Sequence, residues 1–137
     1  MENEYGAYGE DADYLRALVA IVRSRGVAEP LLSCDQANDE MLSRGSIPEL
    51  HRTGTFGSKA GERLETLRRH QSSGPLMCME FWDGWFDSWG RMHHTTEPSD
   101  AAAELDALLA AGASVNIYMV HGGTNFACWN GANDKGA

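Results

Sequence analysis

Residues 98–120, PSDAAAELDALLAAGASVNIYMV, combine the clearest helix signal of the chain with a strand signal directly after it. Residues 98–111 are rich in Ala and Leu, open with Pro-Ser-Asp and stop at Gly112. This pattern predicts an α-helix with proline in its first turn and glycine after its last. Residues 114–120 are mostly apolar, which predicts a strand. A helix that leads into a strand is one step of an alternating α/β pattern.

The same alternation runs through the rest of the chain. The remaining predicted elements are helices at 11–25, 38–44 and 61–71 and strands at 31–34, 53–56 and 75–79. The run at 75–79 is nearly all apolar, as in strands buried on both faces of a parallel sheet. We therefore expect one α/β domain over residues 1–137, built from successive βαβ crossovers. No strand precedes the helix at 11–25, so the unit is expected to be part of a larger protein.

Charge and composition disfavour several classes of partner. The chain of 137 residues has 11 Lys and Arg against 20 Asp and Glu, a net charge of −9, and binding to nucleic-acid phosphates needs clustered cations. No apolar stretch approaches the ~20 residues that cross a bilayer, and no signal peptide is visible. We expect a cytoplasmic location and neither a nucleic-acid nor a membrane partner. The three cysteines, Cys34, Cys78 and Cys128, cannot all pair and are predicted to be free thiols.

Residues 80–90, EFWDGWFDSWG, carry three of the four tryptophans. Glu80 comes directly after the predicted strand at 75–79, at the edge where active sites of parallel α/β proteins lie. A carboxylate flanked by tryptophans suits sugar chemistry, because flat aromatic rings pack against the C–H face of a pyranose. The alternative is that the tryptophans pack in the core and that Glu80 is a solvated loop residue.

Glycoside hydrolysis needs a second carboxyl group, and Glu4 is the candidate. It also precedes a helix, and it lies 76 residues before Glu80, a separation of two to three βα units of ~31 residues each. Tyr118 lies in the last strand, ahead of a glycine-containing loop. That loop lacks the Lys-Ser/Thr of a phosphate-binding loop. Adjacent His93 and His94 have no third ligand nearby, so a metal site is not expected.

Three stretches, residues 1–9, 75–90 and 112–133, resemble the β-galactosidases of glycoside hydrolase family 35. Their most characteristic parts are ENEYGAYG, EFWDGWFDSWG and GASVNIYMVHGGTNF. The resemblance runs through nearly the whole chain, and the His93–Thr96 run is similar to bacterial members. It implies a partial (β/α)8 barrel, namely its carboxyl-terminal half from the end of the fourth strand through the eighth. The strands would form an open arc with the helices outside.

The resemblance also implies a function and its residues. Family members are retaining exo-β-galactosidases that remove terminal β-linked galactose and need no metal or organic cofactor. By resemblance Glu4 is the acid/base and Glu80 the nucleophile. Asn3, Trp82 and Tyr118 would bind the substrate, with Asn3 at the sugar 2-hydroxyl. The alternatives are a non-catalytic carbohydrate-binding remnant and a complementation fragment.

A half-barrel predicts incomplete burial. Some of the apolar side chains Met77, Met79, Val115 and Ile117 should be exposed because the strands that would cover them are absent. We expect the isolated chain to have no appreciable activity and to be aggregated, dimeric through its open sheet edge, or molten.

Overall fold

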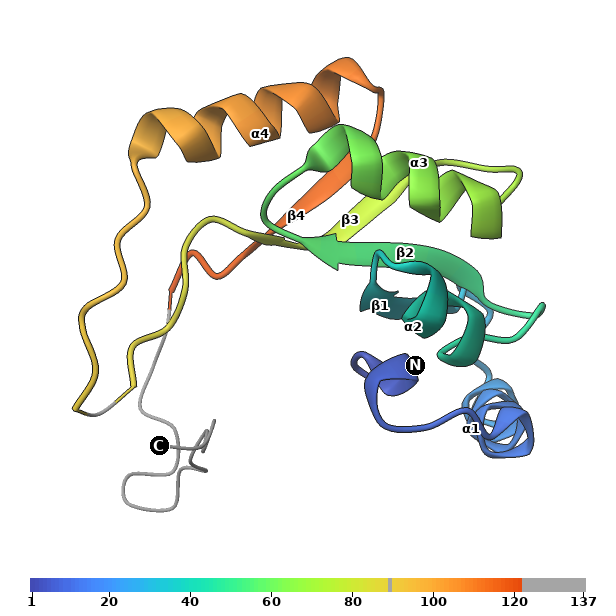
Figure 1. The fold of residues 1–137 in the computed structure, drawn as a ribbon. Helices are drawn as coiled ribbons and strands as arrows, with labels where there is room; N and C mark the ends of the chain where they lie inside the picture. Colours follow the sequence, from blue (N-terminus) through green and yellow to red (C-terminus); the bar gives the residue numbers. More distant parts are fainter. Residues whose placement is uncertain (89, 122–137) are drawn as a thin grey trace.

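The computed structural model describes residues 1–88 and 90–121. Within them lies a four-stranded parallel sheet in the order β1-β2-β3-β4. Its strands are β1 (Leu32–Gln36), β2 (His51–Phe56), β3 (Met77–Trp82) and β4 (Ser114–Tyr118). Each strand pairs with the next one in the chain, so every connection is a crossover that carries a helix (Figure 1). The predicted α/β fold with a parallel sheet is confirmed.

The helices are η1 (Tyr5–Ala7), α1 (Ala12–Ser24), α2 (Asp39–Arg44), α3 (Ala60–His70) and α4 (Pro98–Ala110). The four α-helices begin and end within one residue of their predicted bounds. Local capping explains where α1 and α2 begin. The Asp11 carboxylate accepts the backbone N–H groups of Asp13 and Tyr14 at the start of α1, and the Asn38 side chain accepts that of Met41 in α2. Helix α4 begins with Pro98, as its sequence indicates.

The predicted strands lie in the right places but with different ends. Strand β3 runs from Met77 to Trp82, so Glu80 lies inside the strand, and the prediction that it follows the strand is wrong. Backbone pairing with β2 and β4 continues through Glu80 and Trp82, because ladder hydrogen bonds join backbone groups whatever the polarity of the side chain. Strand β4 ends at Tyr118, two residues before its predicted end at 120.

A β-bulge in β3 decides which side chains share a face of the sheet. Cys78 pairs with Gly54, Glu80 with Thr55 and Phe81 with Phe56, so Met79 is an extra residue with no counterpart on β2. Side chains alternate between faces along a regular strand, which would put Cys78 and Glu80 on the same face. The extra residue moves Glu80 to the opposite face.

The helix side of the sheet holds the main core. The helix-side cluster comprises Ala37, Phe56, Ala60, Leu64, Cys78, Phe81, Leu108 and Ala113. It joins the side chains of β2 and β3 to helices α3 and α4, which lie side by side above the sheet in Figure 1. The other side, which we call the polar face, carries Thr55, Glu80 and Asn116 by register. The bulge therefore separates the apolar core from a polar surface.

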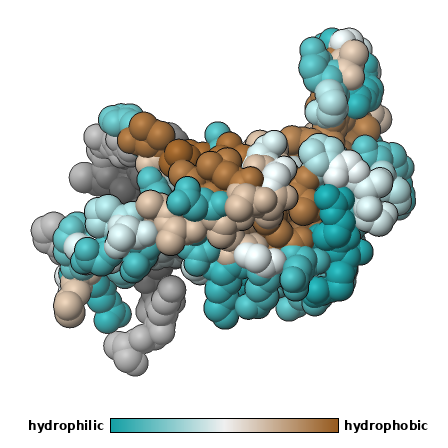
Figure 2. Space-filling view, turned by 90° about the horizontal axis from the view of Figure 1, so that it is seen from above, coloured by the Kyte–Doolittle hydropathy of each residue, from teal (hydrophilic) through white to brown (hydrophobic). Residues whose placement is uncertain are grey.

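The end of the sheet near β4 leaves large hydrophobic side chains exposed. Ile117 is 42% exposed, and Tyr118 and Val120 are exposed as well. Met77, Met79 and Val115 are partly covered, so the predicted exposure is confirmed for Ile117. Seen from above the view of Figure 1, the molecule shows a band of hydrophobic residues across its surface (Figure 2). Whether the chain self-associates through its edges stays a prediction.

Among residues 1–88 and 90–121, no helix is both long and apolar enough to cross a membrane. The predicted loop begins at His121, and its residues from 122 onward, like Trp89, lie outside the described residues. Cys128 belongs to that part of the chain.

Candidate active site

Glu4 is held on the polar side of the sheet by two hydrogen bonds from neighbouring strands. The Thr55 hydroxyl donates to its Oε1 at 2.6 Å, and the Gln36 side-chain amide donates to its Oε2 at 3.2 Å. The backbone of Glu4 is left-handed, with φ of 48°, a conformation that is uncommon outside glycine and frequent at functional sites. It follows that the sheet fixes the carboxylate of Glu4 directly.

The short turn after Glu4 is anchored by a buried carboxylate. Asp35, 1% exposed, accepts the backbone N–H of Gly6 at 2.8 Å through its Oδ1. Burial raises the pKa of Asp35, and the nearby charge of Glu4 raises it further. Asn3 forms a single parallel bridge with Cys34 of β1, and the Glu4 N–H donates to the Cys34 carbonyl at 2.8 Å. Residues 3–6 are thus tied to the first strand at both ends.

Glu80 lies on β3 opposite Thr55. The indole N–H of Trp82, on the same strand, donates to Oε2 of Glu80 at 3.1 Å. This hydrogen bond holds one oxygen of the Glu80 carboxylate. Trp82 and Tyr118 are register partners on β3 and β4, so they lie side by side next to Glu80. The nucleophile candidate is therefore bordered by one candidate aromatic residue from each of the last two strands.

Glu4 and Glu80 converge around Thr55. The hydroxyl of Thr55 contacts Glu4, and its backbone pairs beside Glu80. A second indication is the thiol of Cys34 on β1, the strand that lies between the Asn3 bridge and β2. Burial, together with the nearby charges of Glu80 and, to a smaller extent, Glu4, raises the pKa of Cys34 to about 12. A separation of ~5–5.5 Å between the two carboxyl groups, as retention requires, stays a prediction.

The other candidate residues differ in how they are placed. Asn3 is exposed, and its backbone carbonyl accepts the Tyr8 hydroxyl at 3.1 Å. The ring of Trp82 stands edge-on to that of Trp85, with centroids 5.6 Å apart. Both tryptophans line a cavity of about 820 Å³ between the start of α3 and the start of α4. Trp82 therefore contacts Glu80 on one side and Trp85 on the other, and neither tryptophan belongs to the helix-side cluster.

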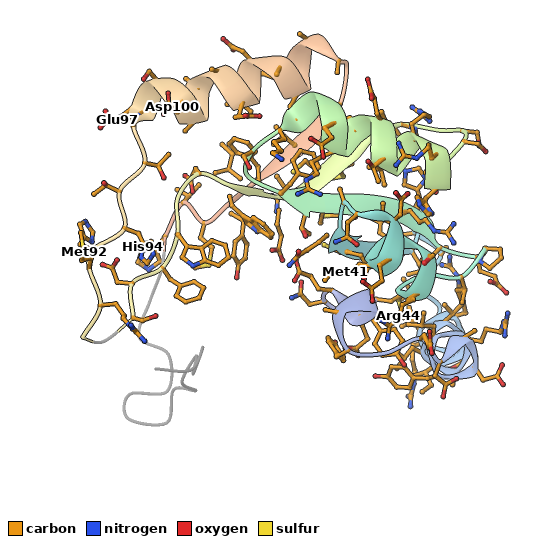
Figure 3. All side chains as sticks on the ribbon, in the orientation of Figure 1. Met41, Arg44, Met92, His94, Glu97 and Asp100 are labelled. Carbon is orange, nitrogen blue, oxygen red and sulfur yellow. The ribbon has the colours of Figure 1, made fainter. Side chains whose placement is uncertain are left out.

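His93 and His94 lie on the loop between β3 and α4. Figure 3 shows His94 and Met92 on this loop, far in that view from Met41 and Arg44 near η1. Both histidines contact Asp87, whose carboxylate accepts the backbone N–H of His94 at 2.7 Å and lies 2.6 Å from Nδ1 of His93. In the part of the chain that the structure describes, no group of three ligating side chains is arranged to hold a metal ion.

Three residues near the two glutamates were not singled out from the sequence, namely Gln36, Thr55 and Asn116. Gln36 and Thr55 bond Glu4 from 32 and 51 residues away in the chain. The Asn116 side-chain amide donates to the Met79 carbonyl at 2.9 Å. The one available signal was the polar residue at alternate positions of otherwise apolar strands, such as Asn116 between Val115 and Ile117.

The chain is similar to known proteins along its whole length. The model of the glycosyl hydrolases family 35 matches residues 1–137. The chain is 44% identical to the β-galactosidase of Mus musculus over 137 residues, and 43% identical to that of Homo sapiens. It is also 40% identical to the human β-galactosidase-1-like protein 2 over 134 residues.

These matches cover 96–97% of this chain and 20–21% of the relatives, so the chain spans about a fifth of their length. The three relatives are mammalian, and the expected similarity to bacterial members stays a prediction. Because the family model spans every residue, the chain belongs to the glycosyl hydrolases family 35.

Proposed function

We propose that the protein of which these residues form the catalytic part hydrolyses terminal β-linked galactosides with retention of configuration. The observation that carries this proposal is Thr55, which bonds Glu4 and pairs beside Glu80. Two carboxyl groups on one polar face, with aromatic rings next to them, suit a glycosidic bond held between an acid and a nucleophile. The names of the mouse and human relatives support galactose as the sugar.

The reaction proceeds by two displacements at the anomeric carbon. Glu4 donates its proton to the glycosidic oxygen while the Glu80 carboxylate attacks, so the bond to the aglycone breaks and a galactosyl ester forms. Glu4, now ionised, then takes a proton from water, whose oxygen displaces Glu80 and releases galactose. The Trp82 indole, which donates to Oε2 of Glu80, leaves Oε1 as the attacking oxygen.

The remaining candidates have supporting roles in this proposal. Asn3 lies next to the acid/base and supplies an amide for the sugar 2-hydroxyl. Tyr118 and Trp82 lie side by side on the last two strands and provide the wall against which the galactose ring packs. Neither role needs a metal or an organic cofactor.

Two other functions remain as alternatives. The chain could act only as a complementation fragment, active after the preceding strands of a barrel are supplied. It could also be a binding remnant that holds a galactoside without cleaving it. Ile117 on β4 is 42% exposed, and this supports the complementation alternative. In a complete barrel, side chains on both faces of the strands are covered, on the inside by other strands and on the outside by helices.

The test is made with the chain alone and with the chain inserted in place of the matched segment of the mouse β-galactosidase. Substrates are nitrophenyl and phenyl β-galactosides, which differ in how much the leaving group needs a proton. Glu80→Gln should abolish turnover of both. Glu4→Gln should spare the nitrophenyl substrate more than the phenyl one, because a good leaving group needs little acid catalysis. Glu65→Gln, an exposed position on α3, is the control and should leave both rates unchanged.

The outcomes separate the three functions. Turnover in the inserted form with this pattern supports the hydrolase, and turnover by the chain alone would show that no further strands are needed. Galactoside binding without turnover in either form favours a binding remnant. Equal losses on both substrates in Glu4→Gln would refute Glu4 as the acid.

A further inference from the structure

Asn116 occupies a position on β4 that the proposed reaction does not use. It lies between Val115, which pairs with Cys78, and Ile117, which pairs with Phe81. Val115 packs against the helix-side cluster, so the alternation of a strand places Asn116 on the polar face. Its side-chain amide donates to the Met79 carbonyl at 2.9 Å, across the boundary between β4 and β3.

The Met79 carbonyl belongs to the extra residue of the bulge. In a bulge the regular ladder is interrupted, and the extra residue is left without its usual partner. Asn116 supplies a donor at that point, from the neighbouring strand. Met79 immediately precedes Glu80 in the chain, so the hydrogen bond holds the peptide unit from which the Glu80 side chain projects.

The bulge is what puts Glu80 on the polar face. Without it, Glu80 would share the face of Cys78, which is 0% exposed within the helix-side cluster. A carboxylate in that apolar cluster could not meet Glu4 and would carry a large desolvation penalty. Any interaction that fixes the bulge therefore fixes the side of the sheet from which Glu80 acts.

We propose that Asn116 is a positioning residue for Glu80, acting through its hydrogen bond to the Met79 carbonyl at the bulge. The expected effect on kcat rests on the proposed function. The expected effect on the orientation of Glu80 rests only on the register of β3. The amide does not contact the substrate in this proposal. It keeps the attacking carboxylate oriented toward Thr55 and Glu4.

The kinetic test uses the chain inserted into the mouse enzyme, with Asn116→Ala, Asn116→Asp and the control Ser114→Ala. Ser114 is exposed two residues away on the same strand. Asn116→Ala should lower kcat about 100-fold, the scale of a misplacement of ~1 Å, and should change KM by less than about threefold. Ser114→Ala should change neither constant.

Asn116→Asp distinguishes hydrogen-bond donation from shape. Aspartate has the shape of asparagine, but its ionised carboxylate cannot donate to a carbonyl. The kcat of Asn116→Asp should therefore be no higher than that of Asn116→Ala at neutral pH. The kcat of Asn116→Asp divided by that of Asn116→Ala should rise as the pH falls toward about 3.9, where the aspartate carboxyl regains its proton. If Asn116→Asp retains wild-type kcat at neutral pH, or if KM rises while kcat is unchanged, the inference is refuted.

A readout without activity keeps the inference independent of the proposed function. The indole N–H of Trp82, which donates to Glu80, gives a nuclear magnetic resonance signal that Trp82→Phe assigns. In the full 137-residue chain, Asn116→Ala should move this signal toward its position in Glu80→Ala, because the carboxylate is no longer held beside the indole. An unchanged signal in Asn116→Ala, where Glu80→Ala moves it, overturns the inference.

The two failures are distinct. An inactive wild-type inserted form, with the Trp82 signal displaced in Asn116→Ala, refutes the proposed function and supports the positioning role. An active wild-type form whose kcat is insensitive to Asn116→Ala supports the proposed function and refutes the positioning role.

Discussion

Two adjacent leucines of α4 allow a direct test of how the helix is attached to the sheet. Leu108 is 0% exposed and belongs to the helix-side cluster, whereas Leu109 is 53% exposed. Leu108 is the buried residue of the thirteen-residue helix α4. We therefore expect Leu108→Ala to detach α4 from the sheet and Leu109→Ala to have little effect.

The expected difference follows from the burial of the two side chains. Truncation of a fully buried leucine costs about 2–5 kcal/mol, which combines lost burial and the cavity left behind. An exposed substitution usually changes stability by less than about 0.5 kcal/mol. Both changes replace Leu by Ala in the same helix, so helix propensity and effects on the unfolded chain are matched. With a total stability of ~5–15 kcal/mol, the Leu108→Ala loss is a large part of the whole.

The measurement is urea unfolding of the full chain, followed by far-ultraviolet circular dichroism. Leu108→Ala should unfold at a clearly lower urea concentration than the wild type, and Leu109→Ala close to it. If the free energies of unfolding of the two variants agree within about 0.5 kcal/mol, Leu108 does not anchor α4 and the described packing of this helix is refuted.

Three further predictions concern Gly61, Asp35 and the pair Cys34 and Cys78. Gly61→Ala in α3, where an added Cβ meets no atom within 4 Å, should raise the free energy of unfolding by about 0.5–1 kcal/mol in urea titrations. Burial raises the pKa of Asp35 from 3.8, so the unfolded chain loses this proton first and stability falls as the pH rises from 3.8 to the higher folded pKa. Asp35→Asn should lack that fall, which unfolding midpoints across this pH range will show. Burial raises the pKa of both Cys34 and Cys78 to about 12; iodoacetamide should therefore label them, by peptide mass spectrometry, only after unfolding.

Local sequence determined the helices and the class of fold. Helix α1 begins where Asp11 can cap it, and α4 begins at Pro98. Capping and apolar spacing act between residues a few positions apart, so they are visible in the sequence. The regular alternation of helix and strand was enough to predict a parallel sheet. The two glutamates were chosen as candidates because each stands in a conspicuous motif, Glu4 directly after Asn3 and Glu80 two residues before Trp82.

Tertiary structure alone decided that both glutamates lie on the polar face of the sheet. Regular alternation would have placed Glu80 with Cys78 in the core, and the bulge at Met79 is visible only once β3 is paired with β2 and β4. The hydrogen-bond donors to the Glu4 carboxylate, Gln36 and Thr55, lie on strands that are far from Glu4 in the sequence. Strand pairing is a contact between distant segments, and one extra residue in it reverses which side chains meet. No pattern of neighbouring residues carries that information.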